Sequence, residues 1–467
     1  MNKTTSNLRS ALAPLVLALL LAGCATSASI DPASLPAAPA AFKENAAAVT
    51  STPVAPQVQG LWWKVFADPV LDGLIEKANG NNSSVQVAAG RLAQARAIAG
   101  QTDANRFPQL GVGAGATRQK NSTTNNVAQT VVSAGANLSY EVDLFGRLSG
   151  ASNAASLDAA SREALLRSTQ LLVQADVAQT YLSLRAMDSE RTLVRDTLQA
   201  YRNTLRLTEV RFREGDVAEL DVARVRSEAA STESEALALD QRRAVLEHAL
   251  AVLVGEVASN FEVAPAAWAT ALPVIPAGVP STVLTRRPDI SAAQSTMQAA
   301  QARVGVAKAA WFPTFSLTAN GGYAAPDIKD LFKLSTQAWG VGALLSLPVF
   351  DGGRREAGVQ GANADLSIAL ASYREQVLVA FRDVEDQLSA LRLLADQSEA
   401  QSRSVASSSR ATLLSDSRYR NGFVSQLELL DAQRSELRNR RQALQVKTAQ
   451  YLATVGLIRA LGGGWSV

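Results

Sequence analysis

The chain has 467 residues, a formal net charge of +3 and only 5% aromatic residues, with one histidine and one cysteine. Its basic and acidic residues are interleaved and form no basic patch, which argues against a nucleic-acid partner. One histidine and one cysteine cannot build a His/Cys metal site, and no carboxylate pair shows acid–base spacing. We therefore expect no enzyme, no catalytic residue, no bound metal and no non-covalent cofactor.

Residues 1–23 have the pattern of a signal peptide, in which Lys3 and Arg9 flank an apolar run over residues 11–22. This run is too short to cross roughly 30 Å of hydrocarbon as a helix. Its end, Leu21-Ala22-Gly23-Cys24, resembles a bacterial lipobox. The resemblance implies that Cys24 carries diacylglycerol on its thiol and an acyl chain, such as palmitate, on its amine. The alternative is a buried or reactive free cysteine.

The residue after the cysteine and the segment that follows predict where the chain is held. The residue directly after Cys24 is Ala25 and not an aspartate. In such lipoproteins, this implies sorting to the outer membrane. Several acyl chains anchor a protein stably in lipid. Residues 24–60 are rich in Ala, Pro, Ser and Val without a helical or strand period, as in an extended tether. We expect a protein anchored in outer-membrane lipid that extends into the periplasm.

From residue 61 onward the sequence contains an internal duplication. The segment from Arg211 to Val217 is echoed by the segment from Arg418 to Val424, 207 positions later. A period this long indicates a duplicated domain and not a solenoid of short repeats. We divide the chain into a first repeat over 61–255, a linker over 256–288 and a second repeat over 289–467.

Each repeat opens with a predicted helix, over 83–106 and 289–311, and continues with two segments in which apolar residues alternate with small or polar ones. This period of two is typical of strands with one apolar face, and segments of about ten residues are the weak signature of membrane β-barrel strands. Taken singly, each segment also fits a soluble hairpin. The four predicted strands cover residues 109–117, 133–143, 314–323 and 338–348.

Two long helices close each repeat, and no proline interrupts any of the four. Apolar residues in them recur at steps of three and four, as in coiled coils. Arginine, aspartate and glutamine throughout exclude a location inside a bilayer, so we expect long coiled coils in water. The predicted helices cover residues 147–213, 218–254, 354–420 and 425–461.

Four strands per chain have a consequence for assembly. In hydrocarbon, strands persist only in a closed barrel, and such barrels begin at about eight strands. The chain must therefore combine with copies of itself, and the residues alone allow two copies, with a filled barrel, or three, with twelve strands and a pore.

Several segments in this order resemble the TolC family of outer-membrane efflux proteins, in particular its lipoprotein branch of OprM/NodT-like proteins. They are Trp62-Trp63-Lys64-Val65-Phe66, Arg286-Arg287-Pro288-Asp289-Ile290, Leu347-Pro348-Val349-Phe350-Asp351-Gly352-Gly353-Arg354 and Tyr419-Arg420-Asn421-Gly422. The resemblance implies an α+β membrane protein that forms a homotrimer. Its 12-stranded β-barrel in the outer membrane is continued by an α-helical coiled-coil barrel across the periplasm. It also implies two partners, a periplasmic adaptor (membrane fusion) protein and an inner-membrane pump of the RND type.

The resemblance further implies a gate at the periplasmic tips of the helices. Glu428 and Asp431 match carboxylates that ring the periplasmic mouth in the family, and Tyr419 matches a tyrosine that helps to lock the closed state. The corresponding positions of the first repeat are Asp221 and Arg224. Without the resemblance, these side chains read as an ordinary solvated helical face.

The function expected from these observations is a passive outer-membrane channel of a tripartite efflux or secretion system. Two alternatives remain open. One is a structural lipoprotein that spans the envelope, although a spacer does not need amphipathic strands. The other is an ungated porin.

Overall fold

The computed structural model describes residues 37–46, 61–120, 128–268, 270, 272–276, 278 and 280–464. The predicted signal peptide, the lipidation site Cys24 and most of the predicted tether lie outside these residues. The chain divides into two compact units, and each takes residues from both sequence repeats. Unit 1 contains Gly90–Glu163 and Ala292–Glu375, while unit 2 contains Ala37–Ala89, Ala164–Ser291 and Gln376–Val467.

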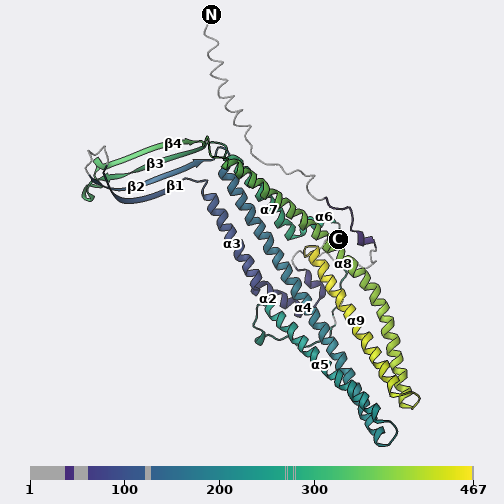
Figure 1. Ribbon diagram of the computed structural model, residues 1–467. Helices are drawn as coiled ribbons and strands as arrows, with labels where there is room; N and C mark the ends of the chain where they lie inside the picture. Colours follow the sequence, from purple (N-terminus) through teal and green to yellow (C-terminus); the bar gives the residue numbers. More distant parts are fainter. Residues whose placement is uncertain are drawn as a thin grey trace. The chain divides into compact units, whose positions relative to one another are not determined.

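Unit 1 contains an antiparallel sheet of four strands in the order β1-β2-β3-β4 (Figure 1). The two hairpins meet along β2 and β3, where Tyr140 lies opposite Leu317. Strands β1 and β4 form the two edges of the sheet. The strands span Gln109–Gln119, Gln129–Val142, Thr314–Ala325 and Gln337–Ser346.

The strand ranges predicted from the sequence differ from the observed ones mainly at the strand ends next to the two hairpin links, β1–β2 and β3–β4. β2 begins at Gln129, four residues before the predicted start, because Val131 and Val132 interrupt the alternation but still extend the pairing with β1. β3 continues to Ala325 and pairs there with Val132. The described link between β3 and β4 is folded into two short 3₁₀ turns, η6 (Ile328–Asp330) and η7 (Leu334–Thr336).

Beside the sheet, unit 1 contains parts of α3 (Ser83–Ala104), α4 (Arg147–Arg213), α7 (Pro288–Ala309) and α8 (Arg354–Arg420). An aspartate lies before the start of both α4 and α8. Asp143 accepts hydrogen bonds from the backbone of Leu148 and Ser149, at 3.0 and 2.7 Å, before α4. Asp351 accepts from the backbone N–H groups of Gly353 and Arg355 before α8. A carboxylate at this position satisfies N–H groups that have no partner within the helix.

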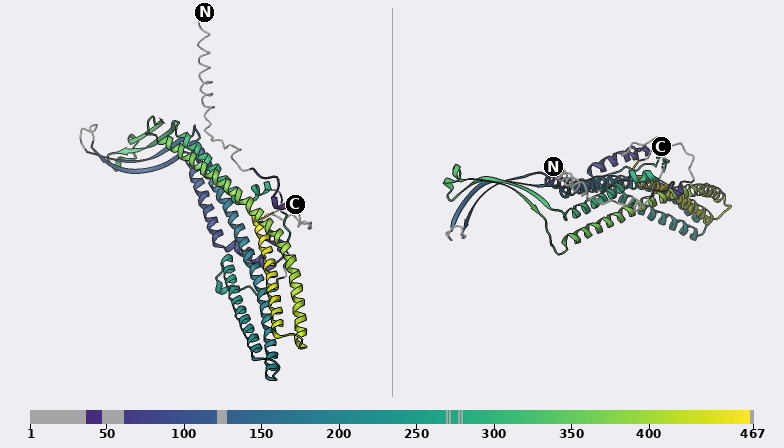
Figure 2. Two further views of the ribbon diagram at one scale, coloured as in Figure 1. Left: turned by 45° about the vertical axis from the view of Figure 1, so that its right-hand side comes forward. Right: turned by 90° about the horizontal axis from the view of Figure 1, so that it is seen from above.

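Unit 2 contains the rest of α4 and α8 together with α5 (Glu219–Val254) and α9 (Gln426–Ala460), and these four helices lie side by side in both views (Figures 1 and 2). Their ends lie within one residue of the predicted ranges. The shorter elements are η2 (Lys43–Ala46), η3 (Trp62–Phe66), α2 (Pro69–Asn81), η5 (Ala258–Asn260) and α6 (Pro280–Arg286). The α+β fold class predicted from the sequence is confirmed.

The core of unit 2 is built around the aromatic segment that precedes α2. Trp62, Trp63 and Phe66 are each at most 2% exposed. The indole N–H of Trp62 donates to Gln174 at 3.1 Å, and the hydroxyl of Tyr181 donates to the carboxylate of Asp68, which also caps α2. These contacts tie the segment to α4. None of the helices in the described part of the chain has both the length and the apolar character needed to cross a membrane.

Candidate functional site

The sheet of unit 1 has two faces of different chemistry. On one face, Val112 and Trp339 are 85% and 75% exposed, although both are apolar. On the other face, the register places Asn137 opposite Gly111 and Asn320 opposite Gly340. A Cβ added at Gly111 lies 2.9 Å from the Asn137 side chain, so the missing side chain leaves room for the amide. Leu344 departs from the pattern, since it is a large apolar residue on the polar face.

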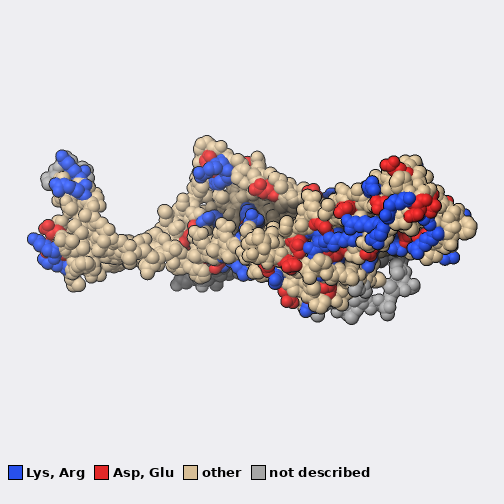
Figure 3. Space-filling view, turned by 90° about the horizontal axis from the view of Figure 1, so that it is seen from below, with Lys and Arg blue, Asp and Glu red and all other residues tan. Residues whose placement is uncertain are grey.

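The exposed apolar face continues over all four strands. Because residues directly opposite one another share a face, the register assigns to it Leu110, Val112, Leu138, Tyr140, Val142, Phe315, Leu317, Ala319, Trp339, Val341, Ala343 and Leu345. In Figure 3 the visible surface of the sheet is almost without charge, and charged side chains gather at the end where the strands are linked. Lys333 and Asp330 form an ion pair of 2.6 Å at this end.

At the other functional region, in unit 2, each pair of long helices ends in the same turn. Gly215 and Gly422 have positive φ values of 82° and 74°, a backbone conformation that costs glycine little. The hydrogen bonds also repeat: the N–H of Gly215 donates to Phe212, and that of Gly422 donates to Tyr419, both at 3.0 Å. The equivalence of these turns supports the duplication inferred from the sequence.

The structure places the five predicted gate residues at these helical tips. Glu428 is exposed, and its backbone N–H donates to the side chain of Ser425 that caps α9. Asp431 is 63% exposed and lies 3.5 Å from Arg434. Asp221 and Arg224 form a long ion pair of 3.7 Å near the start of α5. The structure therefore leaves the carboxylates of Glu428 and Asp431 largely open to solvent in the single chain.

Tyr419 has a different environment from the other predicted gate residues. It is 4% exposed, and the Arg211 guanidinium lies 4.9 Å from the centre of its ring, a cation–π contact between the tips of α8 and α4. Its hydroxyl has no hydrogen-bond partner within the described residues. Within the described residues, no hydrogen bond or ion pair joins Tyr419 to the four charged gate residues.

Behind the tips, ion pairs connect α5 to α9 at intervals of seven residues. Glu228 pairs with Arg434, and one heptad further along both helices Glu235 pairs with Arg441. Arg441 also reaches Glu190 on α4 at 2.7 Å. The sequence reasoning missed these residues, although the seven-residue spacing shared by both helices was a usable signal.

A second series of ion pairs, also missed, connects the antiparallel helices α4 and α5 with the same spacing. In the pair nearest the tip, the acidic residue lies on α4 and the arginine on α5, whereas the other two pairs have the arginine on α4. If α4 were shifted along α5 by one heptad in either direction, like charges would meet, so this pair favours the observed register. The three pairs are Arg195–Asp240, Arg202–Glu233 and Glu209–Arg226, at 2.9, 3.0 and 2.9 Å.

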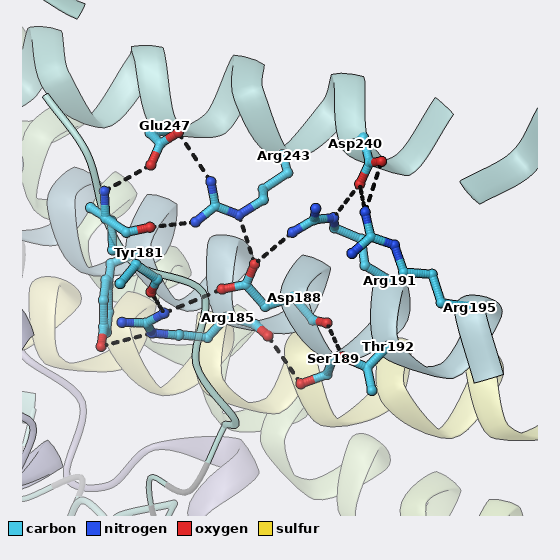
Figure 4. A network of polar contacts seen from close by, with 12 residues as sticks. Tyr181, Arg185, Asp188, Ser189, Arg191, Thr192, Arg195, Asp240, Arg243 and Glu247 are labelled. Carbon is cyan, nitrogen blue, oxygen red and sulfur yellow. Dashed lines mark hydrogen bonds and ion pairs between the residues drawn. The ribbon is translucent and has the colours of Figure 1, made fainter. Parts of the chain in front are cut away.

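At the end away from the tip, this series meets a buried cluster of ion pairs, here called the Asp188 node. The carboxylate of Asp188 pairs with three arginines (Figure 4). Arg243 approaches at 2.7 Å, Arg185 at 3.2 Å and Arg191 at 3.4 Å. Glu247 pairs with the far side of Arg243 at 3.0 Å. Two backbone carbonyls, those of Val263 and Ala264, accept from Arg243 and Arg185. The node fastens the segment after α5 to the helices.

The Arg286-Arg287-Pro288-Asp289-Ile290 segment forms a second node. Arg287 is 7% exposed; it donates to Asp289 at 2.6 Å and to Asp383 of α8 at 3.3 Å. Burial alone raises the pKa of Asp289, but the hydrogen bonds and charge of Arg287 outweigh it and hold this pKa below its ordinary value. The motif that carried the resemblance therefore links the start of α7 to the middle of α8.

Neither node has the chemistry of a catalytic or metal centre. The described residues contain no cluster of three or more His, Cys, Asp or Glu side chains that could hold a metal ion. The carboxylates of both nodes are engaged by arginines, which leaves no paired acid and base.

Known proteins are similar to this chain over most of its length. A family model described as outer membrane efflux protein matches residues 74–256 and 279–463. The pyoverdine export outer membrane protein OpmQ of Pseudomonas aeruginosa is 34% identical over 86% of this chain and 87% of its own length. The cation efflux system protein CusC of Escherichia coli is 30% identical over 97% of this chain and 99% of its own length.

Solved structures give the same result. The outer-membrane channel OprN superposes with a TM-score of 0.87 and 30% identity, and covers 94% of this chain and 99% of its own. The open state of the MtrE outer membrane channel of Neisseria gonorrhoeae superposes with a TM-score of 0.80 and 27% identity, over 94% and 98% of the two chains.

Proposed function

The chain belongs to the outer membrane efflux protein family, and we propose that it is the outer-membrane channel of a tripartite efflux system, working as a homotrimer. In this role it passively conducts substrates that a periplasmic adaptor and an inner-membrane pump deliver. In this proposal, transport energy comes from the inner-membrane pump.

The observation that carries this proposal is the open sheet of unit 1. Its apolar face is solvent-exposed in the single chain, as with Val341 at 77%, and its edge strands β1 and β4 have no strand partner among the described residues. In hydrocarbon each unpaired N–H or C=O costs several kcal/mol. If β1 of one copy pairs with β4 of the next, three copies make a closed barrel of twelve strands, with apolar residues toward lipid and Asn137 toward the lumen.

Cysteine pairs across the edge test this proposal directly. Gly113→Cys in β1 is combined with a cysteine at each position of β4 in turn. Opposed residues on paired strands have Cβ atoms close enough for a disulfide. We expect some of these pairs to give covalent dimers and trimers after mild oxidation. Each single variant serves as the negative control.

A pair inside one chain is the positive control. Gly115 and Ser133 are register partners in β1 and β2, so Gly115→Cys with Ser133→Cys forms a disulfide within one protomer and changes no oligomer. If this control oxidises and no β1–β4 pair gives a covalent dimer, the closed barrel is wrong.

We further propose that Glu428, Asp431, Asp221, Arg224 and Tyr419 form the periplasmic gate. The support is their position beside the two equivalent turns, where a threefold axis repeats each side chain three times. Glu428 and Asp431 have exposed carboxylates in the single chain, so nearby copies can pair with them or repel one another. A gated channel conducts little until these charges are removed, whereas an ungated porin conducts equally with or without them.

The anchor, pump type and cargo are also proposals. The lipobox-like sequence supports diacylglycerol and an N-terminal acyl chain on Cys24, and hence a lipid-anchored outer-membrane location. The family resemblance supports a pump of the RND type. The relatives' names refer to pyoverdine, cations and toluene. Because proteins of similar identity serve such different cargoes, we infer that substrate choice lies with the pump.

A further inference from the structure

The two repeats differ in charge at one set of equivalent positions in unit 2. In the first repeat, Arg191 and Arg195 on α4 both bind Asp240 on α5, at 2.6 and 2.9 Å (Figure 4). Burial raises the pKa of Asp240, but hydrogen bonds from the two arginines outweigh it and lower this pKa overall. The site is therefore a filled ion-pair cluster.

The equivalent positions of the second repeat, 207 residues later, hold different residues. Both arginines are replaced by serines, Ser398 and Ser402 on α8, and the aspartate is replaced by Lys447 on α9. The positive charge therefore lies on the second helix of the pair, α9, and not on the first. The facing positions on α8 hold serines and no carboxylate. Two long side chains are missing as well, so space is left between α8 and α9.

That space is a cavity of about 350 Å³, here called the Lys447 cavity. All three substituted positions line it, together with apolar and polar residues of α8, α9 and the segment before α6. The lining residues are Leu272, Ser398, Gln401, Ser402, Ala443, Lys447, Gln450 and Tyr451. The cavity therefore exists where the first repeat has its two arginine side chains.

Among the described residues, no anion pairs with Lys447 in this cavity. Its ammonium lies 4.6 Å from the ring centre of Trp268 and 5.9 Å from that of Tyr451, and within the described residues it has no ion pair. Burial lowers its pKa, and no carboxylate of the described residues counteracts this effect. Cation–π contacts compensate only part of the cost of burying an ammonium. The hydroxyls of Ser398 and Ser402 are also without a hydrogen-bond partner in this part of the chain.

We propose that the Lys447 cavity binds a carboxylate group, which occupies the space of the two missing arginines and completes the ion pair that the first repeat makes internally. Lys447 supplies the charge and the serine hydroxyls donate hydrogen bonds to the carboxylate oxygens. Leu272, Ala443 and the Tyr451 ring contact an apolar remainder. This combination fits a short aliphatic or aromatic monocarboxylate, or a carboxylate side chain of a second copy of this chain.

Benzoate is the probe for the free ligand, measured by saturation-transfer NMR on the full-length protein in detergent. We expect saturable binding that weakens at least tenfold in Lys447→Met and by no more than a few fold in Lys447→Arg, which keeps the charge. Lys77→Met removes a surface lysine that pairs with Glu256 and serves as the matched control with unchanged binding. Benzoate binding that survives Lys447→Met overturns the proposal.

A variant that carries its own carboxylate in the cavity provides a second readout, the thermal midpoint, which can be measured without benzoate. Ser402→Glu places a carboxylate opposite Lys447 within the same chain. We expect it to abolish benzoate binding and to raise the thermal midpoint, and the rise is expected to disappear when Lys447→Met is added. A rise of the same size without the lysine contradicts the ion-pair account.

Zero-length carbodiimide cross-linking distinguishes the second source. The reagent activates a carboxylate, the Lys447 amine attacks it, and an amide bond forms with loss of the urea. If a second copy supplies the carboxylate, benzoate does not bind, and peptide mapping finds an inter-protomer amide at Lys447 that is absent in Lys447→Arg. If neither saturable benzoate binding nor this amide is found, the proposal is wrong.

Discussion

Removing the carboxylate of Asp188 tests whether the buried node stabilises unit 2. Asp188 is 5% exposed and is shared by Arg185, Arg191 and Arg243. In Asp188→Ala, two of these guanidinium groups stay buried with fewer partners. Breaking a buried ion pair on one side costs about 3–5 kcal/mol. We expect the lower end, about 3 kcal/mol, because Arg243 keeps Glu247 and Arg185 keeps the Ala264 carbonyl.

Asp240→Ala is the matched control for this variant. It removes an aspartate from the same network, but the Asp240 side chain is 35% exposed and Arg191 keeps Asp188. Ion pairs with this much exposure contribute about 0.2–1 kcal/mol. The two substitutions therefore differ in predicted cost by a factor of about three or more.

Thermal unfolding followed by circular dichroism at fixed protein and detergent concentration measures the difference. With about 2–4 °C per kcal/mol for domains of this size, Asp188→Ala lowers the midpoint by roughly 6–12 °C and Asp240→Ala by at most a few degrees. Asp188→Asn, which keeps the volume but loses the charge, falls between them. Equal shifts for the two alanine variants refute the reasoning from burial.

Three further predictions concern the gate, acid stability and the anchor. Glu428→Ala combined with Asp431→Ala is expected to raise single-channel conductance in planar bilayers, because the carboxylates at the tips are removed; unchanged conductance rejects their gate role. The lowered pKa of Asp289 means that its contribution to stability is complete above the ordinary carboxyl value of 3.8 and is lost as the pH falls through the lowered value. Arg287→Met leaves this carboxyl buried without its cation, and burial alone raises its pKa. The thermal midpoint of the variant therefore lies furthest below that of the wild type near neutral pH, and the difference shrinks as the pH falls through the carboxyl range; a difference that stays the same at every pH counts against the pairing. Cys24→Ser is expected to abolish incorporation of labelled palmitate and to mislocalise the protein; persistent labelling excludes Cys24 as the acylated residue.

Much of the fold is predictable from local sequence. The long helices end where they were expected because Gly215 and Gly422 supply the positive φ that follows a helix, and no proline breaks them earlier. The strands were found from their alternation, although the start of β2 was missed where Val131 and Val132 interrupt it. Local chemistry sets both features, so a single sequence reveals them.

The polar nodes could not be predicted in the same way. Asp188 meets Arg243 only after α5 folds back along α4, and the Val263 carbonyl comes from a segment with no regular pattern. The gate residues came from the family resemblance, and their roles stay predictions. The Lys447 cavity became visible only when equivalent positions of the two repeats were compared in space, because a serine and a lysine in a helix have no distinctive spacing.

We propose that one chain supplies four strands of a channel that only several copies can close. Native mass spectrometry of the detergent-extracted, full-length protein tests it most directly, because the method counts the chains in each particle. We expect particles of three chains and no folded single chains. Particles of one or two chains that are active in bilayers contradict it.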